Sequence, residues 1–133
     1  MTMDINEYRG KHIITGEWLK GSLYNDGGEE YILPNIPGSA LDYEDYQVNP
    51  NTVGQLTGVL DVKGNKIFKG DILKVTDIYE PQYCQVMWCE ESAHFYVDYG
   101  RNEHVMLGFV TRNSRTIEIV GNIYDNPEFL KGR

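Results

Sequence analysis

Residues 52–76 read TVGQLTGVLDVKGNKIFKGDILKVT. Short runs of β-branched and aliphatic residues alternate here with glycine and aspartate, which is typical of extended segments separated by tight turns. The pattern predicts a strand over 52–57 and a hairpin over 58–68 that closes around Lys63-Gly64-Asn65. It also predicts a further strand over 72–76.

The polar and glycine residues within this stretch indicate turns. Gly58, Gly64 and Gly70 suit backbone positions with positive φ or a close approach of another chain segment. Asp61 and Asp71 suit turn positions, where a carboxylate accepts hydrogen bonds from nearby backbone N–H groups. We therefore interpret these five residues as scaffold.

The same mixture of short apolar runs and turn residues extends in both directions along the chain. Asp26-Gly27-Gly28 separates two β-prone runs and is a strong hairpin signal, because the central residues of such a turn need positive φ. The further strands that we expect cover residues 12–15, 17–25, 29–33, 83–88, 94–98, 105–111 and 116–124.

Two stretches differ from this pattern. Residues 34–51 form a long connection with no clear period, in which a helical turn over 39–43 could be capped by Ser39. Near the end of the chain, Asn126 and Pro127 predict the cap and first position of a helix of about one turn.

The composition indicates one small acidic domain over residues 1–133. The chain has 20 acidic and 12 basic side chains and a net charge of −8, which disfavours binding to nucleic-acid phosphates. Its start is polar, no stretch approaches a membrane span, and two cysteines make no disulfide framework. We expect a cytoplasmic protein with reduced thiols.

The predicted elements favour an all-β fold. Its centre would be a small, SH3-like, partly open barrel that begins near Val53. An N-terminal β-hairpin would pack beside this barrel, and a short helix would end the chain. This architecture is shared by proteins of many functions, so it does not by itself predict an activity.

Two motifs are similar to a known family. Residues 52–74 resemble the YopX signature Gln-aromatic-Thr-Gly-Leu-x-Asp-x-x-Gly-x-x-Ile-aromatic-x-Gly-Asp-Ile, with Leu56 where an aromatic residue is frequent. Residues 119–130, IVGNIYDNPEFL, resemble its terminal Ile-Gly-Asn-Ile-Tyr-(Asp/Glu)-Asn-Pro-Glu-Leu. Residues 8–11 and 16–18 also look like the opening of one branch of the family.

The resemblance implies an all-β protein encoded by phages or prophages of bacteria, and it implies no catalytic mechanism. We interpret the matched positions as structural. They are Gly54, Gln55, Thr57, Gly58, Asp61, Gly64, Gly70, Asp71, Gly121, Asn122, Tyr124, Asn126 and Pro127.

Residues that could carry chemistry are scattered. His12, His94 and His104 with Cys84 and Cys89 could bind zinc in principle, but the spacing fits no known knuckle. A nucleophilic Cys89 with His94 across a hairpin is disfavoured, because neighbouring glutamates raise a thiol pKa. Phosphate-binding loops are not indicated either. We therefore expect no enzyme, no metal and no cofactor.

Binding functions fit the composition better. Ten tyrosines and two tryptophans suit either a barrel core or a protein interface, in a homo-oligomer or with another phage or host protein. The alternative is nucleic-acid binding by the basic hairpin 63–74, which the net charge opposes. A third idea, an acidic mimic of DNA, rests on charge alone. The candidate nucleic-acid contacts are Lys63, Lys66, Phe68, Lys69 and Lys74.

Overall fold

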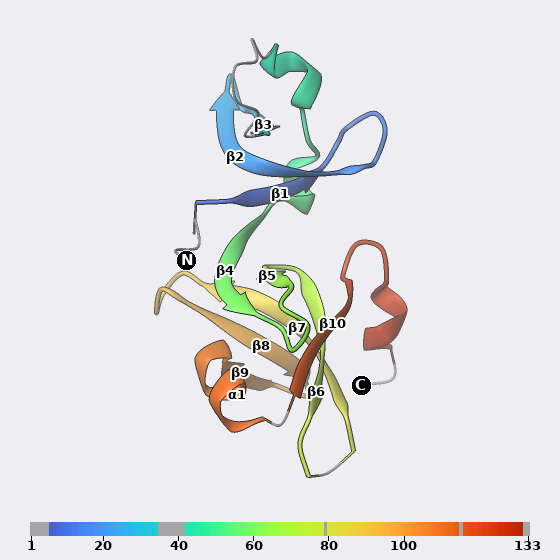
Figure 1. Cartoon of the computed structure of the whole chain (residues 1–133). Helices are drawn as coiled ribbons and strands as arrows, with labels where there is room; N and C mark the ends of the chain where they lie inside the picture. The colour runs from blue at the N-terminus through green and yellow to red at the C-terminus, as the bar shows by residue number, and fades with distance from the viewer. Residues whose placement is uncertain (1–5, 35–41, 79, 115, 132–133) are drawn as a thin grey trace. The chain divides into compact units, whose positions relative to one another are not determined.

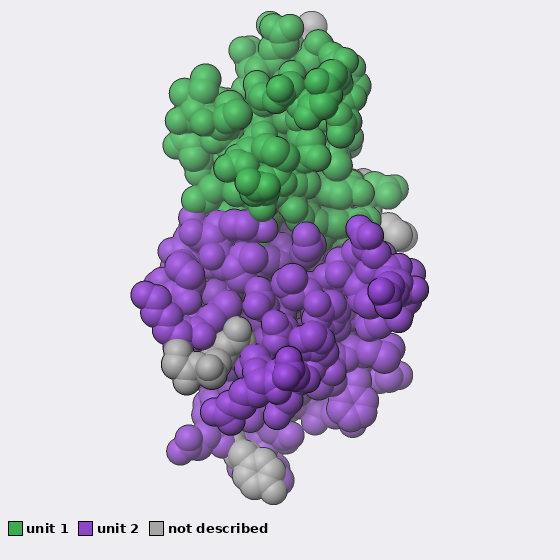
Figure 2. Space-filling view, turned by 180° about the vertical axis from the view of Figure 1, so that it is seen from behind, with its two compact units in different colours: residues 1–56 green, residues 57–133 purple. Residues whose placement is uncertain are grey.

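The computed structural model describes residues 6–34, 42–78, 80–114 and 116–131 and is mostly β (Figure 1). Its contacts group into two compact units, Met1–Leu56 and Thr57–Arg133 (Figure 2). The boundary falls inside a strand, β4 (Gly54–Leu60), so that no linker separates the units. The expectation of a single domain over residues 1–133 therefore stays a prediction. Among the helices of the described residues, none has the length and hydrophobicity that a membrane span requires.

The first unit contains an antiparallel sheet in which β3, β2, β1 and the start of β4 are neighbours in that order. Short 3-10 helices η1 and η2 follow the third strand. The elements are β1 (Tyr8–Lys11), β2 (Trp18–Asp26), β3 (Glu29–Leu33), η1 (Tyr43–Tyr46) and η2 (Pro50–Thr52).

The hairpin predicted around Asp26 is confirmed as β2 and β3. Asp26 still pairs with Glu29, so the two-residue loop consists of Gly27 and Gly28. Their φ angles are 60° and 85°. This is the left-handed combination that a tight hairpin needs and that glycine adopts without strain.

The strand predicted over 12–15 is wrong. The first strand ends at Lys11, and the chain then turns. The cause is the ring of His12, whose Nδ1 accepts hydrogen bonds from Ile14 N at 3.1 Å and Thr15 N at 3.3 Å. A side chain that bonds to the following backbone in this way competes with a strand ladder. Ile14 is left 86% exposed.

Near the end of the long connection after β3, Val48 is fully buried. Its backbone forms an isolated β-bridge with His12. The proposed cap Ser39 lies outside the described residues. The observed helical turn is η1, and it begins later than expected because Asp42 caps it: Oδ1 accepts from Glu44 N at 3.2 Å.

The second unit contains the remainder of β4 beside β5, and a five-stranded antiparallel sheet in the order β10-β6-β7-β8-β9. Its elements are β5 (Lys66–Phe68), β6 (Asp71–Thr76), β7 (Gln82–Cys89), β8 (His94–Gly100), β9 (Glu103–Met106), α1 (Leu107–Asn113), β10 (Thr116–Asn122) and η3 (Pro127–Leu130).

The core of this unit lies on one face of that sheet. Alternate residues of β7 and β8, such as Cys84, Val86 and Val97, are wholly buried there, while their neighbours along the strands are partly exposed. Leu107 and Val110 of α1 join the same cluster. The alternation follows from the pleat, which turns successive side chains to opposite faces.

The strand predicted over 105–111 is wrong in its second half. β9 ends at Met106, and residues 107–113 form the helix α1. Leu107 and Val110 are buried while Phe109 is 53% exposed, which is the spacing of a helix and not of a strand. An apolar run this short fits either period, so the sequence alone does not decide between them.

The chain ends in the expected single turn, but it is a 3-10 helix, and Asn126 does not cap it through its side chain. Instead Asn126 Oδ1 accepts a hydrogen bond from Asn122 N at 3.2 Å. The described strands form antiparallel sheets that do not close into a barrel, in agreement with the predicted all-β, partly open fold.

A candidate binding site on the second unit

An open hollow of about 550 Å3 lies over β7, β8 and β9 at the end of the sheet where β7 turns into β8. Its volume is in the range of sites that hold a side chain or a small ligand. The lining residues are Trp88, Cys89, Glu90, Glu91, His94, Tyr96, His104 and Met106.

The strand register gathers these side chains. Cys89 is paired with His94, and Tyr96 is paired with Met106. Residues directly opposite one another in antiparallel strands project from the same face of the sheet. Because Val97 faces the core, its neighbour Tyr96 faces away from it, and the hollow forms on the outer face.

Aromatic rings form much of this face. The ring centroids of Tyr96 and His104 are 4.9 Å apart, and those of His94 and Tyr96 are 6.3 Å apart. Trp88 also lines the hollow, but it is paired with Phe95 and projects from the core-facing side of the sheet; its ring makes an edge contact with Phe95 at 4.7 Å, and the residue is 37% exposed. Such contacts hold the rings in place while leaving apolar surface in contact with water.

The charge of the site comes from the turn between β7 and β8. Glu90 and Glu91 are exposed, and within the described residues neither side chain has an ion pair or hydrogen bond. Deeper on the same face, Asp98 Oδ1 lies 3.7 Å from His104 Nε2, and Asp98 Oδ2 accepts a hydrogen bond from Gln85 at 3.4 Å. The free carboxylates therefore lie at the rim.

The residues considered for metal or thiol chemistry are only partly brought together. Cys89 and His94 do face one another across the β7–β8 hairpin, as expected. Cys84 is buried on the opposite face, and His12 belongs to the first unit. Among the described residues, no group of three or more potential ligands could hold a metal ion.

Several family-signature residues shape turns, either as glycines with positive φ or as aspartates that accept hydrogen bonds from backbone N–H groups. Gly58, Gly64 and Gly70 have φ angles of 86°, 83° and 92°, as the turn interpretation requires. Asp61 accepts hydrogen bonds from backbone N–H groups, and Asp71 Oδ2 accepts one from Phe68 N at 2.7 Å. These positions lie outside the hollow.

The candidate nucleic-acid contacts do not form an aromatic, basic face. Phe68 is 1% exposed, so the expectation that it could contact a base is wrong: its ring belongs to the interior. Lys63 is paired with Glu118 at 3.4 Å. Base stacking needs an exposed ring beside the cations, and the buried Phe68 cannot supply one.

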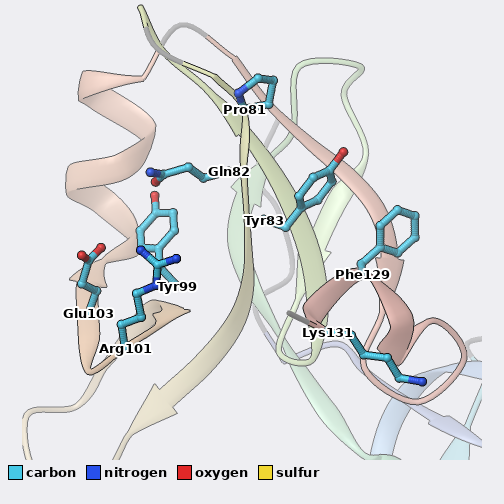
Figure 3. A pocket seen from close by; sticks show the side chains of 8 residues that line it. All are labelled: Pro81, Gln82, Tyr83, Tyr99, Arg101, Glu103, Phe129 and Lys131. Atoms are coloured by element: carbon cyan, nitrogen blue, oxygen red, sulfur yellow. The ribbon is translucent and has the colours of Figure 1, made fainter. Parts of the chain in front are cut away.

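A second, smaller hollow of about 270 Å3 lies near the other end of β7 (Figure 3). Its side chains form two groups, one around Tyr99 and Arg101 and the other around Tyr83 and Phe129, on either side of the strand that carries Gln82. Burial raises the pKa of Tyr99, and the Tyr83 ring stacks on Phe129 at 5.6 Å. The groups do not converge on one point, so we assign no chemistry to this hollow.

The sequence did not single out Trp88, Tyr96 or Met106 as members of a site. For Tyr96, the available signal was the alternation of residues in 94–100, which places every second side chain on one face. Alternation gave no such signal for Trp88, which projects from the other face. What the alternation could not show was the register that sets Tyr96 opposite Met106.

The fold and this site define a small, mostly β protein whose candidate site is an open sheet face. A family model described as YopX protein matches residues 7–131. The chain therefore belongs to the YopX family, as its motifs suggested.

Two solved structures share the fold. A crystal structure of protein EF1440 from Enterococcus faecalis has a TM-score of 0.59 and 19% sequence identity, covering 94% of this chain and 97% of the other. The crystal structure of protein yopX from Bacillus subtilis has a TM-score of 0.59 and 22% identity, covering 98% and 99%. No curated protein matches the chain.

Proposed function

We propose that this chain is a non-enzymatic accessory protein of a phage or prophage and acts by binding another protein at the hollow over β7, β8 and β9. The supporting observation is the exposure of large apolar side chains there: Met106 is 55% exposed and Trp88 is 37% exposed. Aromatic residues and methionine are enriched at the centres of protein interfaces. The partner is a second copy of the chain or another phage or host protein.

The placement of the tyrosines also supports an interface. Among the tyrosines that the structure describes, Tyr31 alone is buried, at 8% exposure, and the others are partly or largely exposed. Most of these tyrosines thus keep part of their ring accessible, although Tyr99 also packs against the core. Tyrosine supplies large contact area and a polar group at modest entropic cost, which suits an interface.

A charge placed in the hollow tests the proposal. We expect Met106→Glu to abolish self-association in sedimentation velocity, or to reduce roughly tenfold the capture of a specific protein by the immobilised chain. Suitable lysates come from B. subtilis and E. faecalis, the sources of the two related structures. The matched control is Phe109→Glu, which changes an equally exposed residue outside this hollow.

Two results would refute the proposal. One is equal loss in the two variants, because a site-specific contact depends on Met106 and not on Phe109. The other is a strictly monomeric protein that captures nothing. A gel-shift titration at low salt with single- and double-stranded DNA and RNA tests the nucleic-acid alternative. No complex is expected for a chain of net charge −8.

A further inference from the structure

We propose that the hollow over β7, β8 and β9 receives an arginine side chain of the partner, held against the rings of Tyr96 and His104 and beside the carboxylates of Glu90 and Glu91. This inference rests on the protein-binding function proposed above and specifies its chemistry. It is carried by two properties of the site: its aromatic wall and its acidic rim.

The aromatic walls favour a planar cation. Tyr96, His94 and His104 line the hollow from the same face of the sheet, and the rings of Tyr96 and His104 are 4.9 Å apart. A guanidinium group is planar, weakly hydrated and stacks on aromatic faces, whereas a lysine ammonium keeps its water more firmly. Arginine is therefore the side chain that this wall fits best.

The acidic rim favours the same occupant. Glu90 and Glu91 lie next to each other in the β7–β8 turn, and their side chains have no partner among the described residues. Two unpaired carboxylates beside apolar rings attract a cation and repel phosphate or another carboxylate. The net charge of −8 adds a long-range attraction for a basic segment.

Other occupants fit less well. A second copy docked symmetrically through this face would bring its own Glu90 and Glu91 against the same residues, because a two-fold interface pairs a patch with itself. A metal ion lacks a ligand set among the described residues. A basic segment of a partner satisfies both the rings and the carboxylates.

The inference can be tested with two peptides that differ in one atom group. The probe is acetyl-Leu-Arg-Leu-amide, and its control replaces arginine by citrulline, which has a similar shape and no charge. In a nuclear magnetic resonance titration of the 15N-labelled full chain, we expect the arginine peptide to shift amides of residues 88–106, with a dissociation constant on the order of 1 mM. The citrulline peptide should produce no shifts there.

Two double variants locate the effect. Glu90→Gln with Glu91→Gln should weaken binding of the arginine peptide by roughly three- to tenfold, the range expected for exposed ion pairs. Glu103→Gln with Glu128→Gln makes the same change in net charge at exposed positions outside the hollow and should leave binding within about twofold.

The outcomes separate this inference from the proposed function. Equal binding of the two peptides, or equal weakening in the two double variants, overturns arginine recognition. If Met106→Glu still blocks protein capture while the arginine peptide does not bind, the protein-binding function stands and the arginine inference falls. If Met106→Glu has no effect on capture, the function itself falls, and the inference falls with it.

Discussion

Asp61 shows how a single buried carboxylate can organise a turn. It is 6% exposed, and its Oδ1 accepts hydrogen bonds from Asn65 N at 2.8 Å and Lys63 N at 3.0 Å. Its Oδ2 accepts one from Ile119 N, at 3.1 Å, on β10. Burial by itself raises the pKa of Asp61, but these backbone N–H groups outweigh it, and the net pKa lies below the ordinary 3.8.

This geometry predicts a pH-dependent contribution to stability. A carboxyl with a lowered pKa in the folded state stabilises the fold above about pH 3.8, and the stabilisation is lost as the pH falls through the lower folded-state pKa. We expect Asp61→Asn to lower the unfolding free energy at pH 7 by about 1–2 kcal/mol, since the amide cannot accept from all three donors. Urea unfolding at pH 7 and pH 3 measures both effects.

The control for this experiment is Asp45→Asn, which changes an exposed carboxylate in the first unit. It should alter stability by less than about 0.5 kcal/mol. If Asp61→Asn loses as much stability between pH 7 and pH 3 as the unmodified protein does, the carboxylate is not the source of that dependence.

Gly121 is required by the corner that follows β10. A Cβ atom at this position would lie 2.8 Å from Asn126 Cβ and 2.5 Å from Asn126 Oδ1. The same Oδ1 accepts from Asn122 N, so Asn126 cannot move away without losing that bond. The close approach explains why glycine stands beside an asparagine corner in this motif.

A double-mutant cycle tests this packing. We expect Gly121→Ala to destabilise the protein by about 1–3 kcal/mol, because the corner must open or the Asn126 side chain must turn out. In an Asn126→Gly background, where the obstructing Cβ is absent, the added penalty of Gly121→Ala should be smaller by at least about 1 kcal/mol. Additive losses in thermal unfolding would show that the two residues do not interact.

Among the elements, the β2–β3 hairpin depends most directly on its turn. Gly27 and Gly28 have positive φ and lie in open space, so only backbone strain opposes a side chain there. We expect Gly27→Asn to be nearly neutral, since asparagine tolerates this conformation. Gly28→Val should destabilise the first unit by about 1–2 kcal/mol. Chemical denaturation followed by Trp18 fluorescence in a Trp88→Phe background measures both variants, and equal costs would contradict the assigned turn.

At the scale of the whole molecule, β4 passes from the first unit into the second without a break. Unfolding of one unit would leave the β4 residues of the other at a free strand end, so we expect one cooperative transition. Each unit contains one tryptophan, Trp18 in the first and Trp88 in the second. In each single-tryptophan variant, Trp18→Phe or Trp88→Phe, the midpoint of guanidinium unfolding by fluorescence should therefore equal the midpoint by far-ultraviolet circular dichroism, which reports the whole chain. Two separate midpoints would identify two domains.

Local chemistry in the sequence was sufficient to predict most of the strands and the turns between them. These elements depend on features that act within a few residues: glycines with positive φ, aspartates that accept hydrogen bonds from backbone N–H groups, and short β-prone runs. Such features can be recognised directly from the amino-acid sequence. The strand 29–33, the hairpin around Lys63-Gly64-Asn65 and the strand 72–76 were found in this way. The family signature also consists of such short-range features.

The tertiary structure decided what local chemistry left ambiguous. The run at 107–113 became a helix because that conformation turns both Leu107 and Val110 into the core. Phe68 became an interior residue, and the candidate site arose where register set Tyr96 opposite Met106 and Cys89 opposite His94. Pairing and burial depend on contacts between residues distant in the chain, and these contacts exist only once the sheet has formed.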